Sequence, residues 1–235
     1  MKAAVSIRLF HTYGEHVRTY PMQDIRHLTM QLNSLLEQAR AGSAMAAIAD
    51  GLQAALETLS AVATHDELTG ALNRRGLVQK LDAELDRAKR TGHPFSFAVI
   101  AVDQFHALNQ QHGSEQGNRI LENLAQAVLA LIRTLDSFGR IGDNEFALIL
   151  PTTWLDQSDK AIARLTKAVS DLNWDDIAPG LAVTFSSGLT TNFAGDTAEQ
   201  MMRRASEALA MAKMQGPGSS AQLEAALPDF DPDML

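Results

Sequence analysis

The stretch S-F-G-R-I-G-D-N-E-F-A-L-I-L, residues 137–150, decides how this chain folds. Two strand-like runs, 137–141 and 145–150, are joined by Gly142, Asp143 and Asn144, which are turn formers that tolerate a positive φ. The pattern therefore predicts a β-hairpin. Upstream, the apolar run 95–102 has the length of one strand, and such a run is typical of a central strand buried on both faces.

Helix-period patterns surround these strands. The spacing of apolar residues and the position of helix-ending residues predict helices over about 75–91, 115–133, 155–172 and 197–214, with a further strand at about 182–190. The resulting order is helix, strand, helix, hairpin, helix, strand, helix. This order predicts an α/β fold in which helices flank a mixed central sheet.

Two further segments flank this domain, which we place at 64–217. Residues 1–63 are predicted to be helical, with a short heptad seam formed by Met45, Ile48, Leu52, Ala55, Leu59 and Val62. This seam predicts either a coiled-coil homodimer or a helical hairpin that folds onto its own domain, and the sequence does not separate the two. Residues 218–235 are small, proline-containing and acidic, which indicates a flexible acidic tail.

The bulk composition narrows the class of partner. The chain has a formal net charge of -8 and a pI near 5.3, which disfavours a nucleic-acid binder because phosphate contacts need a basic surface. A small anionic ligand stays possible, since two or three Arg or Lys side chains can hold one. There are no cysteines, no evident secretion signal and no apolar run long enough to cross a membrane, so we expect a cytoplasmic protein without a membrane partner.

Several separated segments resemble one known family, the GGDEF domains of bacterial diguanylate cyclases. The first is the motif of Asp66, Leu68, Thr69, Gly70, Leu72, Asn73, Arg74 and Arg75. The second is Asp103, Phe105, Asn109, Gly113 and Gly117, and the third is the signature Gly142, Asp143, Asn144, Glu145 and Phe146. Val183 to Gly188 and the cluster Ala212, Lys213 and Gly216 resemble the last strand and helix of the family. The resemblance implies the GGDEF fold, which is nucleotidyl-cyclase-like.

The resemblance also implies a chemistry, and this chain departs from it. In the family, two facing domains condense two GTP molecules to cyclic di-GMP with the help of divalent cations, which need carboxylate ligands. The two positions that carry these ligands in the family hold Ala101 and Asn144 here, and Asp143 replaces a glycine beside the triphosphate. We therefore expect no catalytic residues, no metal site and no cofactor, and a vestigial signature at 142–146.

An alternative stays open. Asp143 or Glu145, helped by Asp103, can in principle hold Mg2+ in a shifted register, which would make the chain an active diguanylate cyclase with a non-standard metal site. The residues that read and hold GTP in the family are partly kept, as Asn109, Asn118 and Lys213, and we interpret these as a vestigial GTP site. For Asn109 and Lys213, a helix cap and a solvated charge are the simpler interpretations.

A second site of the family is retained. Arg133 and Asp136 form the Arg-x-x-Asp pattern with which the family binds its product, and Arg164 matches an additional arginine of that site. Arginine can fork onto guanine acceptors or phosphate, and aspartate can accept from guanine donors. The simpler interpretation of Arg133 and Asp136 is a surface ion pair.

The favoured hypothesis is a cyclic di-GMP receptor that acts through a homodimer of the N-terminal helices or a protein effector partner. A nucleotide-independent structural or partner-binding domain is the remaining alternative.

Overall fold

The computed structural model describes residues 6–9, 18–21, 51–52 and 64–225. Near the N-terminus, β1 (Ser6–Leu9) pairs antiparallel with β2 (Arg18–Pro21). The prediction of helix throughout 1–63 is wrong for these two stretches, where Ser6 to Leu9 alternates polar and apolar residues with the period of a strand. Residues 51–52 are helical, and the rest of the predicted heptad seam lies outside the described residues.

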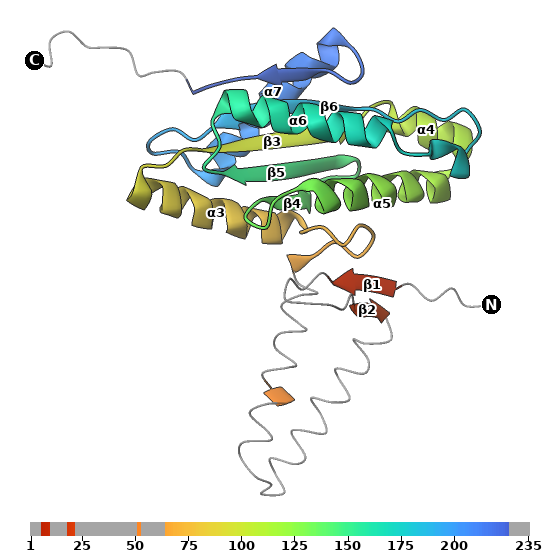
Figure 1. The fold of residues 1–235 in the computed structure, drawn as a ribbon, viewed down its shortest axis with the longest axis horizontal. Coiled ribbons are helices and arrows are strands. Elements are labelled where there is room, and N and C mark those ends of the chain that lie inside the picture. Colours follow the sequence, from red (N-terminus) through yellow and green to blue (C-terminus); the bar gives the residue numbers. More distant parts are fainter. Residues whose placement is uncertain (1–5, 10–17, 22–50, 53–63, 226–235) are drawn as a thin grey trace, which may run out of the picture.

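The domain that follows is built on one sheet with the strand order β4-β5-β3-β6-β7 (Figure 1). Its helices are α3 (Arg74–Thr91), α4 (Phe105–His112), α5 (Ser114–Leu131), α6 (Leu155–Ser170) and α7 (Ala198–Gln215). Its strands are β3 (Phe95–Val102), β4 (Ser137–Arg140), β5 (Glu145–Pro151), β6 (Phe185–Thr191) and β7 (Ser220–Gln222). All neighbouring strands are antiparallel except β6 and β7, so the sheet is mixed, as predicted.

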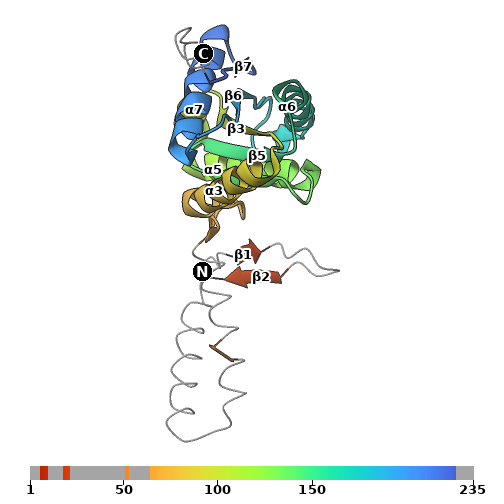
Figure 2. The ribbon, with the colours of Figure 1, turned by 90° about the vertical axis from the view of Figure 1, so that its left-hand side faces the viewer.

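The central strand β3 is buried along its whole length, and its side chains alternate between two hydrophobic layers. Ala98, Ile100 and Val102 face the layer formed with α5 and α6. Phe97 and Val99 face the other layer, where α3 and α7 pack. Figure 2 shows α6 and α7 on opposite sides of the sheet. No helix within the described ranges combines the length and apolarity that a membrane crossing needs.

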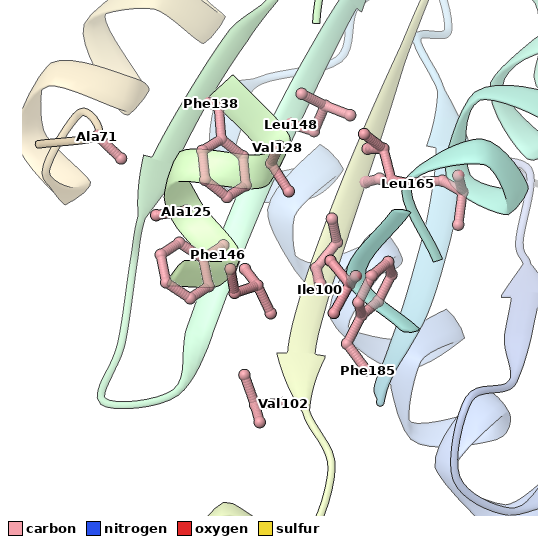
Figure 3. Close-up of a cluster of buried hydrophobic side chains, with 14 of the residues drawn as sticks. Ala71, Ile100, Val102, Ala125, Val128, Phe138, Phe146, Leu148, Leu165 and Phe185 are labelled. Carbon is pink, nitrogen blue, oxygen red and sulfur yellow. The ribbon is translucent and has the colours of Figure 1, made fainter. Parts of the chain in front are cut away.

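The hairpin formed by β4 and β5 packs its Phe138 and Phe146 side chains into the hydrophobic layer that contains α5 and α6. The rings of Phe138 and Phe146 stack with centroids 5.1 Å apart and planes inclined by 8° (Figure 3). In the register of the hairpin, Phe138 is opposite Leu148 and Phe146 is opposite Arg140, so the two rings form a diagonal cross-strand pair. This packing holds the end of β4 that leads to the signature turn.

Besides β1 and β2, the sequence prediction lacked helix α4 and strand β7. Helix α4 has eight residues, and its apolar contribution to the core is limited to Phe105 and Leu108, both half-buried, which is too short a pattern to predict a helix. Strand β7 has three residues and pairs in parallel with β6, which corrects the expectation of a tail over 218–235 for residues 220–222. Its pairing partner lies about thirty residues upstream, beyond the reach of local pattern reading. Residues 226–235 lie outside the described part of the chain.

Candidate functional site

A tight turn at residues 133–136 connects α5 to β4. The backbone N–H of Arg133 donates to Oδ2 of Asp136 at 2.8 Å, and the N–H of Asp136 donates to the carbonyl of Arg133 at 3.0 Å. These two bonds close the turn from both ends. The spacing of the Arg-x-x-Asp pattern thus matches a local structure in which the aspartate also fixes the backbone.

A cavity of about 340 Å³ opens beside this turn and is lined by Arg133, Asp136, Leu150, Thr153, Gln157, Lys160, Ala161 and Arg164. The turn contributes Arg133 and Asp136, and helix α6 contributes Arg164. The structure therefore brings together the three residues that the sequence proposed for ligand binding. Ala161 and Leu150 add apolar surface.

The charges around this cavity are unbalanced. Three cationic side chains, Arg133, Lys160 and Arg164, share it with the single carboxylate of Asp136. None of the three forms a salt bridge within the described residues, and Arg164 makes only a 3.4 Å hydrogen bond from Nη2 to the carbonyl of Leu131. Guanidinium and ammonium groups that line one cavity without forming a salt bridge attract an anion. A surface ion pair of Arg133 and Asp136 does not explain why Lys160 and Arg164 line the same cavity.

The carboxyl group of Asp136 has an altered acidity. Burial raises its pKa above the usual value, while the hydrogen bond from the Arg133 backbone and the charges of Arg133 and Arg164 oppose that rise. A carboxylate in this situation gains from ligand donors that replace lost water. The N1–H and N2–H groups of guanine are donors of this kind.

The sequence did not identify Thr153, Gln157 and Lys160 as neighbours of the site. Gln157, Lys160 and Arg164 follow one another at helical spacing on α6, which places them on one face of the helix. The spacing was visible in the sequence. Its meaning depends on how α6 packs beside the 133–136 turn, and a sequence pattern does not show that.

The signature hairpin has a different character. Ala101 is fully buried and lies opposite Glu145 on β5 and Ser186 on β6. Asn144 donates from Nδ2 to the backbone carbonyl of Val102 at 2.9 Å, and the backbone carbonyl of Asn144 accepts from the N–H of Val102. At the two positions where the family resemblance implies carboxylates, one side chain is a methyl group and the other holds the backbone of β3.

The carboxylate of Asp103 accepts three hydrogen bonds. Its carboxylate accepts from Oγ1 of Thr184 at 2.7 Å, from Oγ of Ser186 at 2.6 Å and from the N–H of Gly218 at 2.7 Å. Three donors satisfy most of the lone pairs of a carboxylate. Asp103 therefore serves as a structural link between the end of β3, β6 and the loop before β7.

The other acidic groups at the hairpin are dispersed. Arg140 donates to the carbonyls of Gly142 and Asp143, which fixes the backbone of the turn, and Glu145 lies 3.9 Å from Nζ of Lys213. Across the described part of the chain there is no group of three or more His, Cys, Asp or Glu side chains arranged to hold a metal. This donor set does not fit the paired divalent cations that the resemblance implies.

The three residues proposed as a vestigial GTP site are only partly assembled. Oδ1 of Asn109 is buried without a hydrogen-bond partner among the described residues, and a Cβ atom at Gly117 would lie 1.8 Å from it. Gly117 is thus needed for α5 to pack against Asn109. Asn118 is the next residue on α5 and is exposed, whereas Lys213 stands at the hairpin beside Glu145.

Comparison with known proteins assigns the family. The family model described as "Diguanylate cyclase, GGDEF domain" matches residues 63–219. The chain therefore belongs to the GGDEF domain family. Diguanylate cyclase DgcP of Pseudomonas aeruginosa is 29% identical over 219 residues, which cover 92% of this chain and 32% of that protein. Response regulator PleD of Caulobacter vibrioides is 34% identical over 159 residues, or 66% of this chain and 35% of PleD. The chain spans about a third of the length of these curated relatives.

Solved structures agree with this assignment. Diguanylate cyclase SiaD from Pseudomonas aeruginosa, in complex with its activator SiaC, is 31% identical with a TM-score of 0.64, covering 86% of this chain and 78% of that one. The GGDEF domain of DgcB from Caulobacter crescentus, in complex with c-di-GMP, is 25% identical with a TM-score of 0.63, covering 70% of this chain and 94% of that one. The mixed sheet with flanking helices is thus the GGDEF fold.

Proposed function

We propose that this chain is a catalytically degenerate GGDEF domain that acts as a cyclic di-GMP receptor through the cavity of Arg133, Asp136 and Arg164. The observation that carries the proposal is the convergence of cationic side chains without salt-bridge partners around one half-buried carboxylate. We refer to this cavity, with its eight lining residues, as the cationic pocket.

The chemistry of the ligand matches these groups. Cyclic di-GMP carries two phosphodiester charges and two guanine bases. A guanidinium can fork onto guanine O6 and N7 or onto a phosphate, and Asp136 can accept from guanine N1–H and N2–H. Adenine offers no donor at N1, so the aspartate favours guanine. A cavity of about 340 Å³ suits one guanine with its neighbouring phosphate, and the remainder of the ligand then projects toward solvent or a second domain.

Isothermal titration calorimetry with cyclic di-GMP tests this proposal. We expect saturable binding by the wild-type chain and a loss of affinity of tenfold or more, roughly, for Arg133→Ala and for Arg164→Ala, because each removes a charge-assisted hydrogen bond. Arg203→Ala is the matched control, since Arg203 is an exposed arginine on α7 that pairs with Glu207 at 3.8 Å and does not line the cationic pocket. Absence of wild-type binding at high micromolar ligand would overturn the receptor assignment and leave the structural or partner-binding alternative.

The cyclase alternative has a separate test. A metal in a shifted register would need Asp103, Asp143 or Glu145, and Asp103 already accepts three hydrogen bonds. Incubation of the purified chain with GTP and Mg2+ or Mn2+, followed by chromatography, is expected to yield no cyclic di-GMP. Formation of the product would replace the receptor proposal by that of an active diguanylate cyclase.

The assembly and location remain part of the proposal. We propose that the receptor works as a homodimer through its N-terminal region, or with a protein partner, in the cytoplasm. SiaD, a similar protein, was solved with a protein activator, which supports a search for such a partner. Light scattering on the full chain, with and without cyclic di-GMP, measures the dimer directly. A monomer under both conditions would contradict the homodimer and leave the protein partner as the proposed assembly.

A further inference from the structure

We infer that Lys160 is a phosphate-binding residue of the cationic pocket, and that nearby carboxylates compete with the ligand for its ammonium group. The inference rests on the proposed cyclic di-GMP site and adds a fourth residue to it. It also assigns to Lys160 a competition between the ligand and the carboxylates of Asp156, Asp159 and Glu224, which line the cavity on its other side.

Lys160 lines two neighbouring cavities, one with mostly cationic and one with mostly acidic side chains. On one side is the cationic pocket, where Lys160 lies with Arg133, Asp136 and Arg164. On the other side is a cavity of about 550 Å³ whose lining includes Asp156, Asp159 and Glu224, which we call the acidic pocket. Lys160 is the one cation among the residues that line the acidic pocket, and three of the other lining residues carry carboxylates.

The position of Lys160 on α6 favours a ligand role. Lys160 and Arg164 are four residues apart, so two like charges occupy the same helical face. Such a pair repels in the empty protein, and an anion between the two side chains relieves that repulsion. Lys160 is exposed and forms no salt bridge within the described residues, so its long side chain is free to swing. A phosphodiester is the part of cyclic di-GMP that a point charge of this kind binds.

The carboxylates on the other side oppose this contact. Asp156 lies one turn before Lys160 on the same helix, and Asp159 and Glu224 line the same acidic pocket. Their attraction favours an orientation of the ammonium away from the ligand. When cyclic di-GMP draws Lys160 into the cationic pocket, the acidic pocket loses its only lining cation. The affinity for the nucleotide is therefore lower than four cooperating residues would otherwise give.

The first test removes the charge of Lys160. We expect Lys160→Gln to weaken cyclic di-GMP binding by about tenfold, as the loss of one charge-assisted hydrogen bond predicts, and Lys160→Arg to retain most of the affinity. Lys167→Gln is the matched control, because Lys167 lies on the same helix but pairs with Asp171 at 2.7 Å outside the pocket.

A second measurement separates phosphate binding from a structural effect. Cyclic di-AMP has the same phosphodiester ring but no guanine donors. Lys160→Gln is expected to weaken binding of both dinucleotides by a similar factor and so preserve the preference for guanine. Asp136→Asn is expected to reduce that preference itself. A Lys160 variant that changed the guanine preference, or that left both affinities unchanged while the wild type bound, would overturn the inference and leave the receptor proposal intact.

The competition is tested by a double-mutant cycle. Asp156→Asn combined with Asp159→Asn is expected to tighten cyclic di-GMP binding about threefold in the wild-type background, because the attraction between exposed opposite charges on this surface is roughly 0.2–1 kcal/mol. In the Lys160→Gln background the same two substitutions are expected to have no effect on the affinity. An equal gain in both backgrounds would show that the carboxylates act on the ligand directly, which contradicts competition for Lys160.

Discussion

Nη1 of Arg140 lies 3.4 Å from both carboxylate oxygens of Asp66, although the two residues are 74 positions apart. Oδ1 of Asp66 also accepts from the N–H and the hydroxyl of Thr69. Arg140, at the end of β4, holds the carbonyls of the signature turn as well. The pair therefore joins the turn at residues 64–73 to the hairpin.

This link predicts a measurable loss of stability. Asp66→Ala removes the ion pair and two local hydrogen bonds from a half-buried position, so we expect the free energy of unfolding to fall by about 2 kcal/mol. Urea unfolding followed by circular dichroism measures this change. Asp171→Ala is the control, because its exposed pair with Lys167 is expected to contribute less than about 1 kcal/mol. Equal losses for the two variants would contradict the structural role of Asp66.

Ligand binding is expected to depend on pH through Asp136. Guanine donors need the ionised carboxylate, and burial raises its pKa in the free protein. The affinity for cyclic di-GMP should therefore be greatest at neutral pH and fall as the pH drops through the raised pKa, at higher pH than an ordinary aspartate would give. Calorimetry from pH 7 to about 4.5 measures the effect. Asp136→Asn is expected to bind more weakly and with a flatter pH profile; a profile that stayed unchanged in this variant would assign the titration to another group.

Substitution by alanine is expected to destabilise the protein strongly at one glycine and only slightly at another. A Cβ atom at Gly188 would lie 2.0 Å from the backbone nitrogen of Leu209, so Gly188→Ala forces β6 and α7 apart and should cost about 3 kcal/mol or more. At Gly142, the nearest atoms to a Cβ lie 3.4 Å away on Glu145, so Gly142→Ala should change stability by less than about 1 kcal/mol. Thermal unfolding of both variants measures the contrast. A severe loss for Gly142→Ala would show that the signature turn is less tolerant than its geometry indicates.

Asn144→Asp restores an acidic group at the signature position and tests its present role. The amide donates to the carbonyl of Val102, whereas a carboxylate there would place two acceptors against each other. We expect a loss of about 1–3 kcal/mol at neutral pH from the unsatisfied acceptors. The repulsion raises the pKa of the new carboxyl, and its protonated form can donate, so the loss should shrink as the pH falls. Urea unfolding at pH 7 and pH 5 measures the difference. If the variant were as stable as the wild type at both pH values, the hydrogen bond from the Asn144 amide to Val102 would not contribute to the stability of the hairpin.

Much of the domain follows from local sequence patterns. Strand β3 and the hairpin of β4 and β5 were predicted nearly to the residue, because a fully buried strand and a Gly-Asp-Asn turn leave strong signals. Helix α4 and strand β7 were missed since α4 contributes only two half-buried apolar side chains to the core and β7 is defined by a distant partner. The β1–β2 hairpin was missed because helical periodicity further along was extended backwards to the N-terminus.

Some residues of the candidate site could also be predicted from local sequence, whereas others could not. Arg133 and Asp136 lie within one turn, so their spacing carried the information, and the family resemblance added Arg164. Lys160 has no sequence signal that distinguishes it from any exposed lysine of a helix. Its meaning arises from the packing of α6 between two pockets of opposite charge. The hydrogen bonds of Asp103 also come from residues more than 80 positions away.

The carboxylate of Asp103 has a structural role that does not depend on a bound nucleotide. Its three hydrogen bonds tie together segments that would otherwise separate at one end of the sheet, with or without nucleotide. Selection for a folded chain alone is therefore sufficient to preserve an aspartate at this position, whether or not the chain converts a nucleotide. The stability of the fold thus accounts for an acidic residue at this position, and its presence does not by itself indicate an active enzyme.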